Sequence, residues 1–101
     1  MSTNIYSIKI NNPVVYTECI ESILSDNGYK SIGSDMNEFR FCPWLIAYKH
    51  PETGEYIVDN INEGFYNKLK EKPDINVIES KLVKDFIDSI QENKKPTYSL
   101  F

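Results

Sequence analysis

Two strand-like runs joined by a short turn constrain the fold more than any other part of the sequence. Residues 39–49 (FRFCPWLIAYK) are the densest apolar run, and residues 55–59 (EYIVD) follow after the turn HPETG. The first run is short for a helix and rich in aromatic residues, which favours a strand. A bend is expected at Pro43, because proline cannot donate to a sheet ladder. Gly54 provides the positive φ that a tight turn needs, so the sequence predicts a β-hairpin.

The N-terminal part of the chain predicts a strand followed by a helix. Residues 5–10 alternate weakly between apolar and polar side chains, as in a half-buried strand. The pair Asn12-Pro13 then begins a helix, since asparagine caps helices and proline suits the first helical position. Apolar residues recur at helical spacing until Asn27-Gly28, which ends the helix. Cys19 falls on this apolar stripe and is expected to pack in the core. Residues 29–38 are expected to form a loop.

The C-terminal part predicts two further helices. Asn60 with Glu63 three residues later resembles a capping box, so a short helix is expected to run to about Lys70 and to bury Ile61, Phe65 and Leu69. Residues 75–79 fit either a short strand or the front of the last helix. Residues 81–92 form the clearest helix, with Leu82, Val83, Phe86, Ile87 and Ile90 as its apolar stripe.

These elements follow the order β-α-β-β-α-(β)-α, with the fourth strand in brackets. We therefore expect an α/β protein of the α+β kind, a two-layer sandwich with a mostly antiparallel sheet and its helices on one face. A chain of 101 residues is expected to form a single domain, 1–101, with a C-terminal tail over 94–101.

The second strand poses a question, because both of its faces are apolar. In a two-layer sandwich one sheet face meets water, and its strands alternate apolar and polar residues. Here one face has Phe39, Phe41, Leu45 and Ala47, and the other has Arg40, Cys42, Trp44, Ile46 and Tyr48. Something is therefore expected to cover the second face. The chain's own tail (Tyr98, Leu100 and Phe101), a second copy of the protein forming a homodimer, and a different partner are the three alternatives.

The charge of the chain is mildly acidic and unevenly distributed. The net charge is −4, whereas nucleic-acid binding needs a basic surface, so direct binding of nucleic acid is disfavoured. Residues 1–66 carry nine acidic and four basic residues, and residues 67–101 carry six acidic and seven basic residues. The acidity therefore belongs to one region, which favours a directed electrostatic surface.

Within that region, residues 50–67 combine carboxylates with aromatic rings and contain no lysine or arginine. Such a mixture suits binding to a basic protein cleft, because rings anchor an interface and surrounding charges steer association. The predicted partner-binding residues are Glu52, Glu55, Tyr56, Asp59, Glu63, Phe65, Tyr66 and Trp44.

The leading hypothesis is a small acidic inhibitor that occludes a basic cleft, such as that of a nuclease or toxin domain. An immunity protein, an antitoxin and a phage-encoded blocker all fit this description. The first alternative is a dimeric regulatory domain that binds a small molecule through its sheet face. The second alternative is a small hydrolase that uses Cys42 and His50, which could approach each other across the hairpin.

The other kinds of site are disfavoured by residue type and spacing. His50 is the one histidine, and the histidine and cysteine residues are too few for a usual metal site. The four glycines are scattered and form no phosphate-binding loop. We therefore expect no enzymatic activity, no metal and no cofactor.

The sequence also predicts where the protein acts. The N-terminus lacks the apolar stretch of a signal peptide, and no run of residues is long enough to span a membrane. Cys19 and Cys42 match no redox or metal spacing. We therefore expect a cytoplasmic protein with two reduced thiols and no membrane partner.

Overall fold

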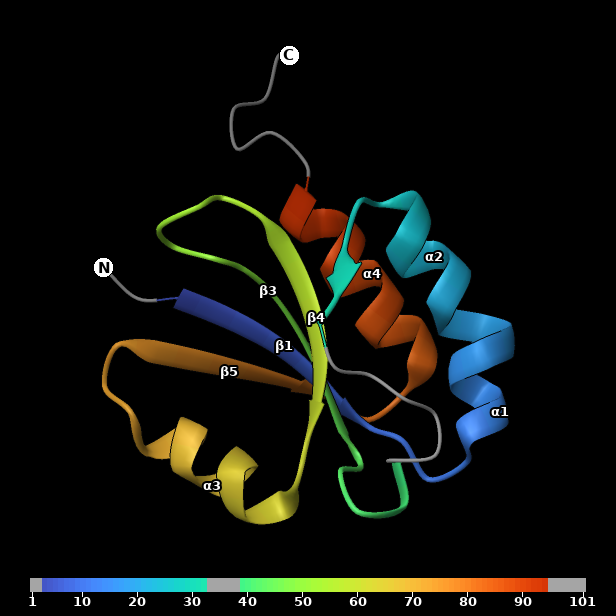
Figure 1. Cartoon of the computed structure of the whole chain (residues 1–101), viewed down its shortest axis with the longest axis horizontal. Coiled ribbons are helices and arrows are strands. Elements are labelled where there is room, and N and C mark those ends of the chain that lie inside the picture. Colours follow the sequence, from blue (N-terminus) through green and yellow to red (C-terminus); the bar gives the residue numbers. More distant parts are fainter. Residues whose placement is uncertain (1–2, 33–38, 95–101) are drawn as a thin grey trace.

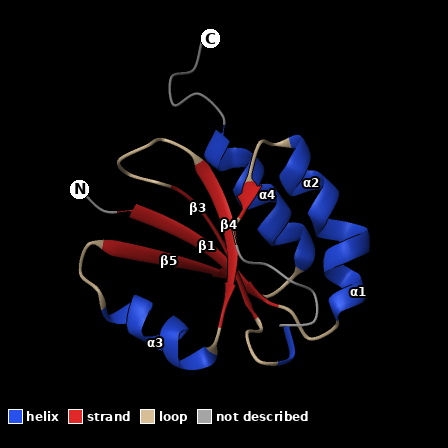
Figure 2. Cartoon of the chain, viewed as in Figure 1, coloured by secondary structure: helices blue, strands red, loops and turns tan. Residues whose placement is uncertain are grey.

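The computed structural model describes residues 3–32 and 39–94 (Figure 1). The strands are β1 (Thr3–Lys9), β2 (Lys30–Ser31), β3 (Trp44–Lys49), β4 (Tyr56–Ile61) and β5 (Ile75–Ser80). The helical segments are α1 (Pro13–Val15), η1 (Tyr16–Ile20), α2 (Glu21–Asp26), α3 (Glu63–Glu71) and α4 (Val83–Lys94). Because α1, η1 and α2 follow one another without a break, they form one continuous helix (Figure 2). The α+β class predicted from the sequence is confirmed.

The five strands form one mixed sheet in the order β2-β4-β3-β1-β5. The central strand β3 is antiparallel to both neighbours, β1 and β4. The outer pairs, β1 with β5 and β2 with β4, are parallel. The strand expected over 75–79 is therefore present as β5. The sheet is less antiparallel than expected, because each outer strand is paired in parallel.

The two parallel connections determine where the helices lie. The continuous helix 13–26 connects β1 to β2, and α3 connects β4 to β5. All four strands run in the same direction, but the two connections cross the sheet towards opposite edges. Crossovers between parallel strands are right-handed in almost all proteins. Two right-handed crossovers in opposite directions must pass over opposite faces of the sheet. Accordingly, α3 lies on one face and α1, α2 and α4 lie on the other (Figure 1).

The helix arrangement therefore differs from the expected one, in which all helices shared a face. We call the side covered by α1, η1, α2 and α4 the first face, and the side with α3 the second face. The order of elements along the chain did not reveal this, because it does not specify how far each connection crosses the sheet. Part of the apolar second face that the sequence left unexplained is covered by α3.

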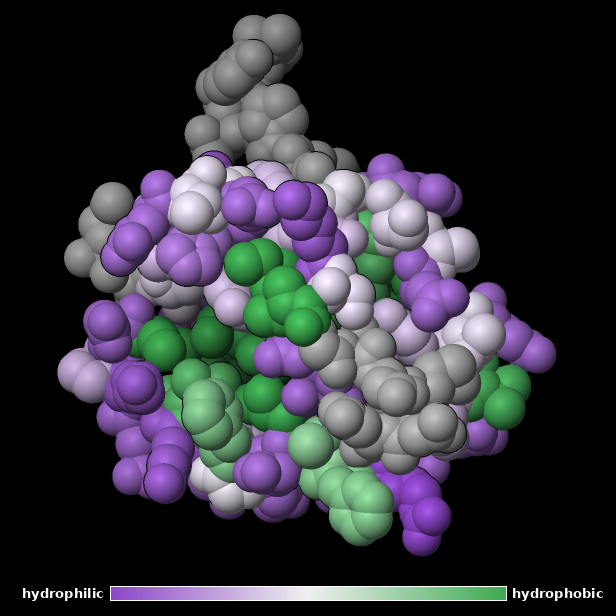
Figure 3. Space-filling view, viewed as in Figure 1, coloured by the Kyte–Doolittle hydropathy of each residue, from purple (hydrophilic) through white to green (hydrophobic). Residues whose placement is uncertain are grey.

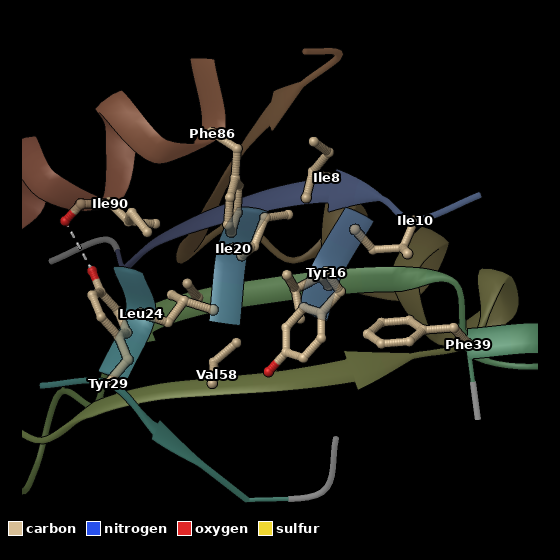
Figure 4. Close-up of a cluster of buried hydrophobic side chains, with 12 residues drawn as sticks. Ile8, Ile10, Tyr16, Ile20, Leu24, Tyr29, Phe39, Val58, Phe86 and Ile90 are labelled. Carbon is tan, nitrogen blue, oxygen red and sulfur yellow. Dashed lines mark hydrogen bonds between the residues drawn. The ribbon is translucent and has the colours of Figure 1, made fainter. Parts of the chain in front are cut away.

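The first face carries the larger core (Figure 4). Phe86 and Ile90 of α4 and Ile20 of η1 have no exposed surface, and Tyr29 donates a hydrogen bond from its hydroxyl to the Ile90 carbonyl at 3.2 Å. The core residues are Ile8, Ile10, Tyr16, Ile20, Leu24, Tyr29, Phe39, Leu45, Ala47, Val58, Phe86 and Ile90. Leu82, expected in the apolar stripe of the last helix, precedes α4 and is 64% exposed.

A π-helical turn changes which residues of the continuous helix face this core. At η1 the Glu21 N–H donates to the carbonyl of Tyr16, five residues earlier. Such a turn contains an extra residue, which rotates the side chains relative to a regular α-helix. Tyr16 and Ile20 are buried, whereas Cys19, expected on the same stripe, is exposed. Cys19 and Cys42 are both free thiols.

The hairpin is present, but its first strand is shorter than predicted. β3 begins at Trp44, directly after Pro43. Pro43 has no N–H for the ladder, and its carbonyl accepts a hydrogen bond from the Ile10 N–H at 2.7 Å. Phe39 and Phe41 therefore precede the strand; Phe39 packs in the first-face core and Phe41 is 73% exposed. The two-residue strand β2 lies in the segment expected to be loop.

The start of α3 also differs from the prediction. The capping residue is Asn62, whose Oδ1 accepts the Phe65 N–H at 2.8 Å. Asn60, the expected cap, is still in β4, where it pairs with Leu45. Because the helix begins later, its buried residues are Tyr66 and Leu69, and Phe65 is 53% exposed.

Two expectations concern the end of the chain and the membrane. Residues 95–101 lie outside the described residues, as does the suggestion that Tyr98, Leu100 and Phe101 cover the second face. The predicted tail began at residue 94, but α4 continues to Lys94. In residues 3–32 and 39–94, no helix combines the length and apolar character that crossing a bilayer requires.

Candidate functional site

The four predicted carboxylates are spread along β4 and its two ends. Glu52 lies in the turn before β4, Asp59 lies within the strand, and Glu63 is the first residue of α3. The six-residue strand separates Glu55 from Glu63 by about 20 Å, which is more than two Debye lengths at physiological salt. The carboxylates therefore act as separate groups at the two ends and the middle of the strand.

Two of the four carboxylates are already paired within the protein. Glu55 forms an ion pair with Lys30 at 3.0 Å. Glu63 lies 3.8 Å from the Lys9 ammonium and accepts a hydrogen bond from the Trp44 indole N–H. Glu52 and Asp59 form no ion pair with any described residue. Their charges are the ones most available to a partner.

Two of the predicted aromatic anchors are buried in the protein itself. Trp44 and Tyr66 stack with ring centroids 3.8 Å apart and planes 9° apart. They belong to the second-face core, which also contains Ile5, Ile46, Ile61 and Leu69. Tyr66 has no exposed surface, and Trp44 is 8% exposed. In this conformation neither ring can contact a partner.

The other two predicted aromatics differ from each other. Tyr56 points to the first face, where its ring packs edge-on against Tyr29 at 5.3 Å. Phe65 is exposed beside the second face. Of the four predicted anchors, Phe65 is the one with a largely accessible ring.

A buried chain of hydrogen bonds holds Tyr66, a residue of α3, against the sheet. The Ser7 hydroxyl lies 2.8 Å from the Tyr66 hydroxyl, which donates to the Glu79 carboxylate at 2.7 Å. Burial is the main reason that the pKa of Tyr66 is raised well above its usual value, and the Glu79 interaction raises it further. Tyr66 is therefore a structural group that holds α3 against β1 and β5.

The part of the second face that α3 leaves uncovered forms an open groove of about 520 Å³. Its main apolar lining comes from four strands and α3, and includes Ile5, Ile46, Ile61, Phe65, Leu69 and Ile75. Figure 3 shows a hollow with hydrophobic residues on the side of the molecule where α3 and the β3–β4 turn lie. The groove is large enough for a drug-sized molecule or a short piece of chain.

The charged and polar groups of this groove are mostly anionic or neutral. Asp59 and Asp74 contribute carboxylates, Tyr48 contributes a hydroxyl, and no lysine or arginine is among the lining residues. The Asp59 Oδ1 accepts the neighbouring Asn60 N–H at 2.8 Å. Burial raises the pKa of Tyr48, and the charge of Asp59 raises it further. The electrostatic preference of the groove is therefore for a cation.

His50 lines the same groove and also shapes the turn beside it. Its Nδ1 accepts the backbone N–H groups of Glu52 at 3.2 Å and Thr53 at 3.3 Å. Gly54 completes the turn with φ +75°. The histidine thus serves as a turn cap in this structure.

The arrangement proposed for a hydrolase does not form. Cys42 precedes β3 and His50 follows it, so the strand separates them by about 20 Å. The two side chains lie at opposite ends of the sheet. Within the described ranges, no group of three His, Cys, Asp or Glu side chains could hold a metal ion.

Two lining residues of the groove, Asp59 and Phe65, were among the binding residues predicted from the sequence. The sequence did not predict the groove itself, nor that Tyr48, His50 and Asp74 line it. The one signal was the apolar character of both faces of the 39–49 run, which indicated an unfilled second face. The groove itself depends on which part of that face α3 covers. Searches against protein-family models, curated proteins and solved structures found no match to this chain.

Proposed function

We propose that this protein is a small, acidic, cytoplasmic inhibitor that binds a basic cleft of a partner protein, such as a nuclease or toxin domain. The observation that carries the proposal is the groove beside β4. It combines the exposed ring of Phe65 and the partly exposed Ile75 with Asp59 and Asp74, and its lining contains no lysine or arginine. Apolar contacts provide affinity and like-signed charges around them steer a basic partner. An immunity protein, an antitoxin and a phage-encoded blocker are all proteins of this kind.

The binding surface of the proposal is smaller than the set of residues predicted from the sequence. It consists of Glu52, Glu55, Asp59 and Phe65, with Glu63 at the far end of β4. Trp44 and Tyr66 support this surface from below, because their stacked rings hold α3 in place. Tyr56 packs on the first face and is not part of it.

The test uses the double charge reversal Glu52→Lys with Glu55→Lys as bait, in parallel with the wild type. The matched control is Asp85→Lys with Glu92→Lys, which makes the same change in net charge on α4, across the sheet. Each bait is incubated with an extract of cells that naturally express the protein. The rate of association with any retained partner is then measured at low and high salt.

If the proposal is correct, a basic protein will bind the wild type and the α4 control at the same rate. The Glu52/Glu55 variant should associate about ten-fold more slowly at low salt, and the difference should shrink near 1 M salt, where the Debye length is about 3 Å. Equal rates for both double variants, or a partner with an acidic binding surface, would refute the proposal. Turnover of a compound by the pure protein would also argue against it.

A second candidate function is a dimeric regulatory domain that binds a small molecule. The size of the groove favours it, because about 520 Å³ lies within the range of small-molecule sites. This function predicts a concentration-dependent dimer by light scattering and heat of binding on titration with metabolite mixtures. A monomer that binds a basic protein would favour the inhibitor instead.

A further inference from the structure

We propose that the second-face groove accommodates a short segment of the partner protein that carries an arginine or lysine between apolar residues. The cation would lie against the Asp59 carboxylate, and the apolar neighbours would pack on Ile46, Ile75 and Phe65. This inference rests on the proposed function, since it names the part of the partner that the groove receives.

Asp59 has no cationic partner among the described residues. It is half-buried on β4 and faces the same side of the sheet as Ile46, with which it pairs across the two strands. Its side chain forms no ion pair with a described residue, and its one hydrogen bond comes from the neighbouring backbone N–H. A partly buried carboxylate without a cation is stabilised by one that a ligand brings.

The groups that surround the Asp59 carboxylate favour a cation. Asp74 adds a second negative charge to the lining, and Tyr48 keeps its proton and can donate or accept a hydrogen bond. The His50 Nδ1 is occupied as the acceptor of the turn N–H groups. Asp59 and Asp74 attract a cation, and the lining contains no lysine or arginine.

The size and apolar lining of the groove suit a short segment of chain. Ile5, Ile46 and Ile75 come from three neighbouring strands and line the sheet side of the groove, and Phe65 and Leu69 of α3 line the opposite side. The volume of about 520 Å³ exceeds what a single side chain fills and suits a few residues of chain. Apolar surface next to a carboxylate fits the long aliphatic stem and charged end of arginine or lysine.

The experiment measures cation selectivity directly and needs no natural partner. The ¹⁵N-labelled full chain is titrated by NMR with benzamidine and with its neutral isostere benzamide. It is also titrated with a peptide of about five residues containing two arginines among apolar residues, and with the citrulline analogue of that peptide. Chemical-shift changes of the backbone amides are followed at Ile46, Tyr48, Asp59 and Ile75.

The expected result is that the arginine peptide shifts groove resonances and binds at least about five-fold more tightly than its citrulline analogue, as expected of a half-buried charged hydrogen bond. Benzamidine should exceed benzamide in the same way and bind more weakly than the peptide. Asp59→Asn, which keeps the Oδ1 acceptor, should remove most of the selectivity. Asp88→Asn on α4, across the sheet, should leave it unchanged.

Several results would overturn the inference. Equal binding of the charged and neutral probes would show that the groove does not recognise cations. Benzamidine binding as tightly as the peptide would identify a small-molecule site, and groove shifts that grow with protein concentration alone would identify a second copy as the occupant. The proposed inhibitor function is tested separately, by the association rates of the Glu52/Glu55 variant, whose two carboxylates lie outside the groove lining.

Discussion

The hydrogen-bond chain beneath α3 leads to a quantitative prediction for Tyr66→Phe. This change keeps the ring stacked on Trp44 and removes only the hydroxyl that links Ser7 to Glu79. The Ser7 hydroxyl is fully buried, and Tyr66 is its one hydrogen-bond partner among the described side chains. Removing the Tyr66 hydroxyl therefore leaves a buried polar group unsatisfied.

The size of the effect follows from the two bonds lost. The Glu79 carboxylate is exposed and can turn to water, so this bond contributes little beyond about 1 kcal/mol. An unsatisfied buried hydroxyl costs about 1–3 kcal/mol. We expect Tyr66→Phe to lower the free energy of unfolding by about 2 kcal/mol, which is a large part of the stability of a domain this small.

A double-mutant cycle with Ser7→Ala distinguishes the two contributions. Ser7→Ala removes the group that would be left unsatisfied, so the double variant should be less destabilised than the sum of the single variants, by about 1 kcal/mol. Urea unfolding followed by Trp44 fluorescence measures all four proteins. A Tyr66→Phe variant within about 0.3 kcal/mol of the wild type, or strictly additive effects, would refute the reasoning.

Three further predictions concern the α3 cap, the turn and alkaline pH. Asn62→Ala should lower stability by about 1 kcal/mol in urea unfolding, because the Phe65 N–H loses its acceptor; Asn62→Asp should not. Gly54→Ala should lower it by about 1–2 kcal/mol, because alanine is strained at φ +75° although the space around the site is open. Since the pKa values of Tyr48 and Tyr66 are raised in the folded state, the unfolded state releases protons first as pH rises through about 10. The contribution of these tyrosines to stability should then be constant below that pH and fall above it, by up to about 1.4 kcal/mol per pH unit for Tyr66. Phenolate absorbance should also appear late in the folded protein, and stability that stays unchanged between about pH 9 and pH 11 would contradict this prediction.

Much of the fold was predictable where short-range chemistry decides it. The Asn12-Pro13 start, the Asn27-Gly28 end and the turn at Gly54 all appear where the sequence placed them. In contrast, β2 at Lys30–Ser31 exists only because β4 pairs with it, and two residues carry no periodic signal. Such a strand cannot be found from local sequence.

The candidate site was less predictable, because it depends on tertiary geometry. The acidic and aromatic residues of 50–67 were identified, but their sequence pattern does not show which ring faces the core. Asn60 and Asn62 are equally good caps, and choosing the earlier one placed Phe65 inside and left Tyr66 as an anchor. The crossing direction of α3, which decides what remains uncovered, follows from strand order rather than from residue type.

The central strands β1 and β3 couple the unfolding of the two cores. Ile5 and Ile46 support one core, and Ile8 and Leu45 support the other, so the same two strands serve both sides. If α3 detached, Ile5 and Ile46 would lose their packing. The same strands carry Ile8 and Leu45, so the rest of the domain would not be stable by itself. Both sides should therefore melt together, and hydrogen exchange at the central strands should report complete unfolding rather than partial opening.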